Sequence, residues 1–258
     1  MAKVGLFAKG IVYCLIGLLA FMSAFHIGGQ SASKSDKSGL VQYLLQQPLG
    51  KIALIIISAG LLCYSIWRFM QTFLDTEHKG KEPKGLGKRF SYFFSGVAYL
   101  SVSFIAIKAV LENSANSNGK SRADMVQSLL EKPWGVWVLI AQALVLSGIG
   151  IYQVWYGFSE KYKKHVDAQE LDQKTSYSLL KAGKIGYIAR GIVWLLIAFL
   201  LFKAITHHNA SEAGDTGTAF SFVQNNPYGT YLLAILAIGL ICYGVMNFIR
   251  AAFERVGR

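Results

Sequence analysis

Six long apolar blocks dominate the sequence and constrain its fold more than any other feature. They span residues 7–25, 52–73, 90–111, 134–158, 187–205 and 228–248. Each has the ~17–25 residues that a helix needs to cross a bilayer. Only 16% of all residues are charged, against about 25% in soluble domains. The pattern predicts an all-α integral membrane protein with six transmembrane helices.

Lys and Arg are distributed unevenly between the two sides of these predicted spans. Eighteen of the 26 fall on the side that holds both termini, and eight fall on the other. Because membrane proteins retain Lys and Arg on the cytoplasmic side, we expect both termini in the cytoplasm. The same retention explains the formal net charge of +12. Nucleic acid is therefore not an expected partner.

A set of short motifs recurs three times, each copy covering two apolar blocks. A glycine opens each unit, a Pro-x-Gly motif precedes its second block, and a Gly-x-x-x-Tyr motif lies within that block. The positions are Gly10, Gly96 and Gly191; Pro48, Pro133 and Pro227; Gly50, Gly135 and Gly229; Gly60, Gly148 and Gly239; and Tyr64, Tyr152 and Tyr243. Two spans per unit make the repeats parallel. We expect three helix-hairpin repeats, at 5–75, 87–160 and 183–254, with pseudo-threefold symmetry.

The middle copy differs from the other two in its spacing. The Pro-x-Gly glycine precedes the tyrosine by 14 residues in the first and third copies and by 17 in the middle one. Since three residues are nearly one helical turn, the packed face should be roughly kept. We therefore expect Gly60, Gly148 and Gly239 all to lie at close helix contacts.

A short amphipathic stretch precedes each Pro-x-Gly motif. Apolar residues at i, i+3 spacing mark it: Val41 and Leu44, Val126 and Leu129, and Phe220 and Val223. This spacing predicts a short helix in the outer membrane interface. Asp124 and Thr218 are suitable N-caps, and Gly39 is a weaker one. The alternative is an ordered loop without a helix.

The motifs resemble a known bacterial membrane family, catalogued as domain of unknown function 1206. The resemblance rests on the basic-Gly starts Lys9-Gly10 and Arg190-Gly191, the Pro-x-Gly motif and the Gly-x-x-x-Tyr motif. It covers roughly residues 5 to 254, and the middle copy departs from it where Ser95 replaces the basic residue. The resemblance implies six helices in a bacterial inner membrane. It implies no activity and no catalytic residues.

Chemistry-bearing residues are scarce within the spans. All 14 Asp and Glu lie outside the six blocks, whereas proton-coupled carriers usually hold a carboxylate at membrane depth. No hydrolase or nucleotide-binding motif is complete. His26 and His207 occupy equivalent outer positions and could bind a metal or haem, but Glu112 takes that place in the middle copy. We therefore expect no enzyme and no cofactor.

Four basic residues, Lys9, Arg68, Arg190 and Arg250, stand near the cytoplasmic ends of their spans. One interpretation is a site for an anion or a lipid headgroup between hairpins. The favoured one is snorkelling, in which long side chains reach the interface. The repeated tyrosines are interpreted as an aromatic belt and helix packing.

The leading functional hypothesis is a non-enzymatic scaffold or partner subunit, with the lipid bilayer and a second membrane protein as partners. The runner-up is a pore or carrier for a small solute or ion along the pseudo-threefold axis. A haem- or metal-binding protein is the third. Polar residues on a continuous cavity would favour the runner-up, and a sealed apolar axis would favour the scaffold.

Overall fold

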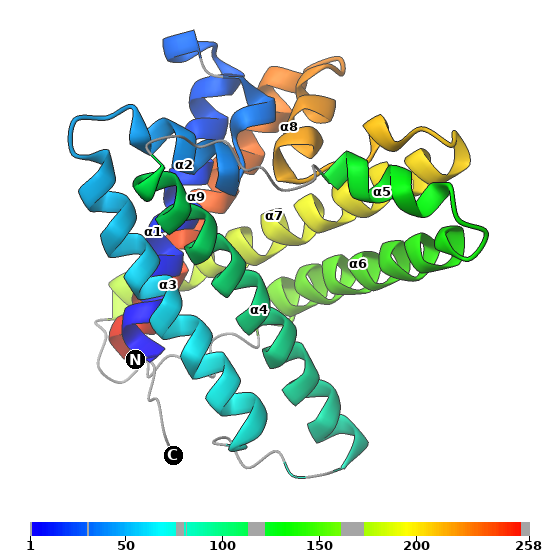
Figure 1. Ribbon diagram of the computed structural model, residues 1–258. Coiled ribbons are helices and arrows are strands. Elements are labelled where there is room, and N and C mark those ends of the chain that lie inside the picture. Colours follow the sequence, from blue (N-terminus) through cyan, green and yellow to red (C-terminus); the bar gives the residue numbers. More distant parts are fainter. Residues whose placement is uncertain are drawn as a thin grey trace.

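The computed structural model describes residues 2–29, 31–75, 80, 82–112, 122–160 and 173–253. These residues form long helices joined by short helical segments (Figure 1). In chain order the elements are α1 (Ala2–Ala24), η1 (Ile27–Gly29), η2 (Ala32–Lys34), α2 (Lys37–Leu45), α3 (Gly50–Phe73), α4 (Pro83–Leu111), α5 (Arg122–Leu130), α6 (Gly135–Phe158), α7 (Gln173–Thr206), η5 (Ala210–Glu212), α8 (Thr216–Gln224) and α9 (Gly229–Phe253).

The six predicted spans correspond to α1, α3, α4, α6, α7 and α9. All six are long and apolar enough to cross a membrane. Both α4 and α7 begin well before the predicted blocks, because the residues ahead of each block continue the helix. Pro83 stands at the start of α4, where its missing N–H breaks no helical hydrogen bond.

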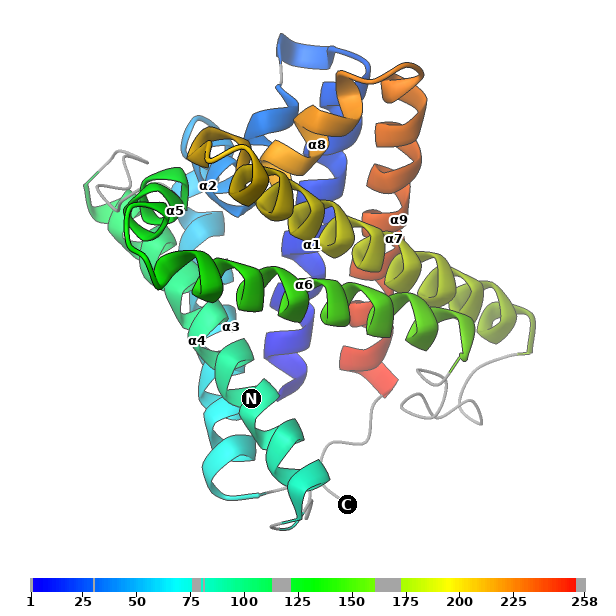
Figure 2. The same cartoon turned by 90° about the vertical axis from the view of Figure 1, so that its right-hand side faces the viewer.

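The six long helices pack in the order α4–α3–α1–α9–α7–α6, each against the next. The first helix of each repeat therefore lies against the second helix of another: α1 against α9, α4 against α3 and α7 against α6. Within repeats, α1 also packs on α3 and α7 on α9. Among the described residues α4 and α6 do not pack along each other, so the middle hairpin is open. In Figures 1 and 2 the α6–α7 pair is steeply inclined to the α1–α9 pair.

The three short helices α2, α5 and α8 gather at the end of the molecule opposite the two termini (Figures 1 and 2). The expected helix before each Pro-x-Gly motif is thus confirmed. The expected N-caps are wrong. Asp36 caps α2 and Asp215 caps α8. The backbone N–H groups of Gly39 and Thr218 donate hydrogen bonds to these two carboxylates. Asp124 lies within the first turn of α5.

Glycines allow the closest contacts between repeats. A Cβ atom on Gly10 of α1 would lie 3.0 Å from the carbonyl oxygen of Gly244, and one on Gly244 of α9 would lie 2.8 Å from that of Gly10. At the α3–α4 contact, Ser65 takes the place of the second glycine and donates a hydrogen bond to the Gly96 carbonyl at 2.8 Å. Small residues matter here because lipid supplies no hydrophobic force to press helices together.

The expected glycine contacts within repeats are present in two copies and absent in the third. A Cβ on Gly60 would lie 2.6 Å from that of Ala8, and one on Gly239 would lie 2.2 Å from that of Ala189. Gly148 has no such neighbour within 4 Å, so the prediction for Gly148 is wrong.

The reason lies in the register of α6. Counted from the Pro-x-Gly glycine, the position of Gly60 and Gly239 is occupied by Val145, and that of Tyr64 and Tyr243 by Ile149. A three-residue insertion falls about 60° short of a full helical turn. The residues after the insertion therefore point in a different direction from their counterparts in the other repeats. Tyr152 is therefore 57% exposed, whereas Tyr64 and Tyr243 are each 1% exposed.

The opposing position on the first helix of each repeat is also larger in the middle copy. Phe94 stands where the other repeats have Ala8 and Ala189. Bulky side chains at both Phe94 and Val145 keep α4 and α6 apart, because close helix approach in a membrane needs small residues on the facing surfaces.

Candidate functional site

The centre of the molecule holds a cluster of cations among tyrosine rings, which we call the basic core: Lys9, Arg68, Arg190 and Arg250 with Tyr13, Tyr64, Tyr99, Tyr187 and Tyr243. Its innermost cation is Lys9 on α1, which is only 5% exposed. The Lys9 ammonium lies 5.7 Å from the ring centres of Tyr64 and Tyr99. It lies 5.4 Å from that of Tyr243. Lys9 therefore does not snorkel to the interface, and that interpretation is wrong for this residue.

Arg190 on α7 shares the Tyr243 ring with Lys9 and also contacts Tyr13. Its guanidinium carbon is 4.7 Å from the ring centre of Tyr243 and 5.2 Å from that of Tyr13, and its Nη1 donates a hydrogen bond to the Tyr243 hydroxyl. Its Nε is buried and has no hydrogen-bond partner among the described residues. A buried unpaired donor of this kind costs about 1–3 kcal/mol, more when charged.

Arg68 on α3 and Arg250 on α9 complete the set. Arg68 donates from Nε to the Tyr64 hydroxyl at 2.9 Å and from Nη1 to Gln71 Oε1 at 2.9 Å. Arg250 donates to the Tyr187 hydroxyl at 3.4 Å. The four basic residues singled out in the sequence thus contact one network of tyrosines.

Edge-to-face contacts join the tyrosines to one another. The ring centres of Tyr13 and Tyr243 are 4.8 Å apart, and those of Tyr64 and Tyr99 are 4.9 Å apart. Tyr187 continues the chain to Tyr243 at 5.3 Å. Tyr64 and Tyr243 are therefore core residues, and the aromatic-belt interpretation is wrong for them. Five helices, α1, α3, α4, α7 and α9, meet through these rings.

Three of the four cations of the basic core have no acidic partner in the part of the chain that the structure describes. Lys9, Arg68 and Arg190 form no ion pair there; the described pairs of Lys108 with Glu112, Lys184 with Glu160 and Lys203 with Glu212 involve other residues. Moving a charge out of water costs several kcal/mol unless it is paired. A cation–π contact stabilises a desolvated cation by roughly 2 kcal/mol. Among the described residues, the tyrosines alone leave the positive charge of Lys9, Arg68 and Arg190 uncompensated.

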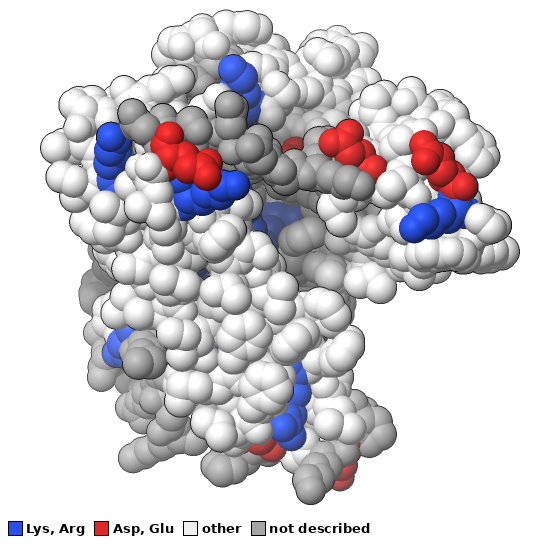
Figure 3. Space-filling model, in the orientation of Figure 1, with Lys and Arg blue, Asp and Glu red and all other residues white. Residues whose placement is uncertain are grey.

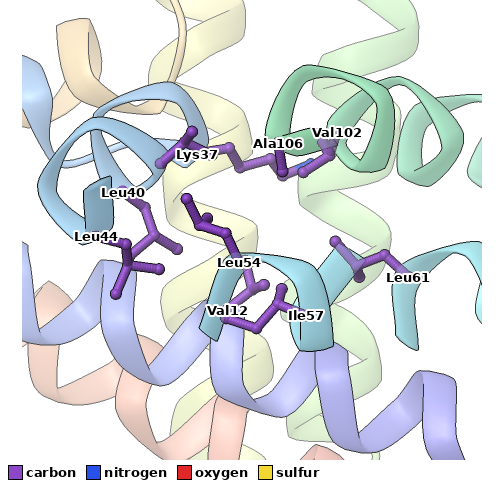
Figure 4. A pocket seen from close by; sticks show the side chains of 10 residues that line it. Val12, Lys37, Leu40, Leu44, Leu54, Ile57, Leu61, Val102 and Ala106 are labelled. Carbon is purple, nitrogen blue, oxygen red and sulfur yellow. The ribbon is translucent and has the colours of Figure 1, made fainter. Parts of the chain in front are cut away.

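A fifth cation, Lys37 of α2, approaches the basic core from the end away from the termini. Its ammonium is 5.3 Å from the ring centre of Tyr99. Burial, followed by the charge of Arg190, lowers the pKa of Lys37 to about 8, against a partly opposing effect of Asp36. Lys37 lines a small cavity of about 10 Å³ with apolar side chains of α1, α2, α3 and α4, among them Val12, Leu61 and Ala106 (Figure 4). That volume is about enough for one water molecule.

Two aspartates that the sequence places 179 residues apart meet beside Lys37. Asp36 accepts hydrogen bonds from Ser38 N and Gly39 N, and Asp215 from Gly217 N and Thr218 N. Asp36 is 7% exposed. Burial, and then the Asp215 carboxylate, raise the pKa of Asp36 to about 6. No local sequence pattern joins these two aspartates, because both lie in loops outside the apolar blocks.

The candidate histidine ligands lie at the rim of the molecule. His26 is exposed just after α1. His207 Nδ1 is 3.1 Å from Glu212 Oε1, and this hydrogen bond lowers the pKa of Glu212. Among the described residues, no group of three His, Cys, Asp or Glu could hold a metal ion.

The described residues thus form six apolar helices long enough to cross a membrane, as helical multi-pass membrane proteins do, with a basic core buried among them. The family model described as Domain of Unknown Function (DUF1206) matches three times, at residues 4–75, 90–160 and 185–254. The chain belongs to this family. It is similar to the uncharacterized protein YxxB of Bacillus subtilis (strain 168), with 29% identity over 98% of this chain and 90% of that protein. No solved structure matches the chain.

Proposed function

We propose that this chain is a non-enzymatic protein of the bacterial cytoplasmic membrane, a scaffold or partner subunit whose core is completed by a bound anion. The observation that carries the proposal is the convergence of Lys9, Arg68 and Arg190 on shared tyrosines, with no carboxylate paired to them among the described residues. Arginine stays protonated in proteins, so loss of a proton from Lys9 would leave the charge of the guanidinium groups in place.

The donor set suits an anion. Arg190 offers the unpartnered Nε, and Lys9 offers an ammonium whose contacts in the described structure are to rings rather than to acceptors. The hydroxyls of Tyr64 and Tyr243 accept from arginines and keep their own protons to donate. Such charge-assisted hydrogen bonds are about twice as strong as neutral ones.

The arrangement of the repeats supports a common axis for this site. In each repeat the first helix packs on the second helix of another repeat: α1 on α9, α4 on α3 and α7 on α6. This order is the one expected for three parallel hairpins related by pseudo-threefold symmetry. The basic core lies where the first helices of all three repeats contribute a residue: Lys9, Tyr99 and Arg190.

A pore or carrier remains the second candidate, because cationic residues converge within the spans. It needs a continuous polar path, and the cavity beside Lys37 has a volume of about 10 Å³ and mostly apolar walls. The scaffold with a bound anion requires no such path.

Thermal unfolding in a neutral detergent tests the proposal. Sulfate, phosphate and chloride should each be titrated at constant ionic strength. An anion held in the core should raise the stability saturably, by about 2.7 kcal/mol at a hundred times its Kd. The double variant Lys9→Met with Arg190→Gln should lose this response, and the matched control Lys108→Met with Lys203→Gln, at exposed ion pairs, should keep it. A response of equal size in both variants would reject the site.

A further inference from the structure

The open middle hairpin leaves apolar surface without a partner among the residues that the structure describes. Phe94 of α4 is 56% exposed, Val145 of α6 is 61% exposed and Tyr152 is 57% exposed. Of the six spans, those in α4 and α6 are the least buried, each at 28%, against 61% for the span in α9. The side of the molecule between α4 and α6 therefore offers the most apolar surface for another molecule to cover.

This opening follows from side-chain size. The corresponding hairpins close where Ala8 meets Gly60 and where Ala189 meets Gly239. With Phe94 and Val145 at those positions, α4 and α6 cannot approach as closely without overpacking. The gap between them is thus encoded in the sequence of the middle repeat.

Both walls of the gap lead to the basic core. Tyr99 of α4 lies beneath the Lys9 ammonium. Tyr156 of α6 packs at 4.9 Å against Tyr187, whose hydroxyl accepts from Arg250. Between them, Gly191 of α7 lies against α6, next in sequence to Arg190. Figure 3 shows basic side chains at the bottom of a recess between α4 and the α6–α7 pair.

The geometry points to an anionic phospholipid as the occupant of this gap. Its phosphate-bearing headgroup binds Lys9, Arg190 and the tyrosine hydroxyls, and its acyl chains lie along the apolar walls formed by α4 and α6. This inference rests on the proposed anion site and names its ligand. A lipid fits better than free phosphate because its tails match Phe94 and Val145 and because a lipid reaches the gap sideways from the bilayer.

Native mass spectrometry of the full chain in a neutral detergent, with thermal unfolding of the same samples, provides the test. The probes are phosphatidylglycerol, zwitterionic phosphatidylcholine and inorganic phosphate. We expect the wild type to retain and be stabilised by phosphatidylglycerol in preference to phosphatidylcholine. The double variant Lys9→Met with Arg190→Gln should lower phosphatidylglycerol retention at least about tenfold.

A second pair of substitutions tests the gap without touching the charges. Phe94→Ala with Val145→Gly restores the small residues of the other repeats, so α4 and α6 should close and exclude the lipid. Its matched control, Phe104→Ala with Leu144→Gly, also removes a phenylalanine from α4 and a branched aliphatic side chain from α6, at other exposed positions. It should retain lipid as the wild type does. An unfolding temperature at or above that of the control would show that loss of lipid in the closing variant is not loss of fold.

The outcomes separate this inference from the proposed function. If inorganic phosphate stabilises the wild type saturably but phosphatidylglycerol is neither retained nor stabilising, the lipid inference is overturned and the anion site stands. If neither anion acts, both are overturned. Equal retention of phosphatidylglycerol by the closing variant and its control, or a second protein chain filling the gap in its place, would also overturn the lipid inference.

Discussion

Gly150 of α6 and Gly191 of α7 face each other so closely that neither can carry a side chain. A Cβ atom on Gly150 would lie 3.0 Å from the Gly191 carbonyl oxygen, and one on Gly191 would lie 2.9 Å from that of Gly150. Gly10 and Gly244 have the same reciprocal relationship across α1 and α9. The contact between repeats is thus built in the same way at two places where the residues are remote in sequence.

We expect Gly150→Leu to destabilise the protein by about 1–3 kcal/mol, because the new side chain overpacks the contact of α6 with α7. Two residues earlier on the same helix, Gly148 has open space around its Cβ position. Gly148→Leu should therefore be neutral or slightly stabilising, since a glycine within a helix costs about 0.5–1 kcal/mol relative to alanine. Thermal unfolding in detergent compares the two; equal losses would contradict the assigned helix face.

Asp36→Asn should make stability less dependent on pH. The pKa of Asp36 is about 6 in the folded protein against 3.8 for an ordinary aspartate, so the folded protein binds a proton that the unfolded chain has already released. The stabilisation is present at low pH and is lost as pH rises through the folded pKa. Asparagine cannot ionise and caps a helix as well as aspartate does.

Measured from ~pH 4 to ~pH 7, the wild type should lose stability relative to Asp36→Asn. Asp124→Asn, at an exposed carboxylate in the first turn of α5, serves as the control and should follow the wild type. Parallel curves for the wild type and Asp36→Asn would show that the carboxyl is not buried beside Asp215.

The distribution of Lys and Arg predicts that both termini are cytoplasmic and that the end carrying α2, α5 and α8 faces outward. Single cysteines at the exposed positions Ser33 and Ser211 should react with a membrane-impermeant thiol reagent on intact cells, in a background lacking Cys14, Cys63 and Cys242. A cysteine at Ser159, at the other end, should react only after the cells are opened. The reverse pattern would invert the orientation.

Purified protein in liposomes should not accumulate any solute in response to a proton gradient. No Asp or Glu lies within the six spans, and a proton-coupled carrier usually needs a carboxylate that changes charge within the membrane field. Asp36 is buried but belongs to the segment between spans, before α2. Gradient-driven uptake that is abolished by Asp36→Asn would show that this carboxyl acts within the membrane field.

Local sequence patterns predicted where the long helices lie, but they did not predict correctly which face of every helix is packed. The Pro-x-Gly motifs correctly placed the starts of α3, α6 and α9, because proline and glycine act within one helical turn. The choice of Gly148 and Tyr152 as counterparts of Gly60 and Tyr64 was wrong. The repeats were aligned on their Gly-x-x-x-Tyr motifs. In the structure, the equivalent positions of α6 are instead those counted from Gly135 at its start, which are Val145 and Ile149.

The sequence by itself determined that this chain has six membrane-length helices in three copies, because hydropathy and repeat spacing are properties of neighbouring residues. Only the tertiary structure decided that Lys9 is buried among tyrosines, that Asp36 meets Asp215 and that the middle hairpin stays open. Each of these depends on which helix faces of different repeats come together. Packing between helices sets that choice, and the residues involved are far apart along the chain.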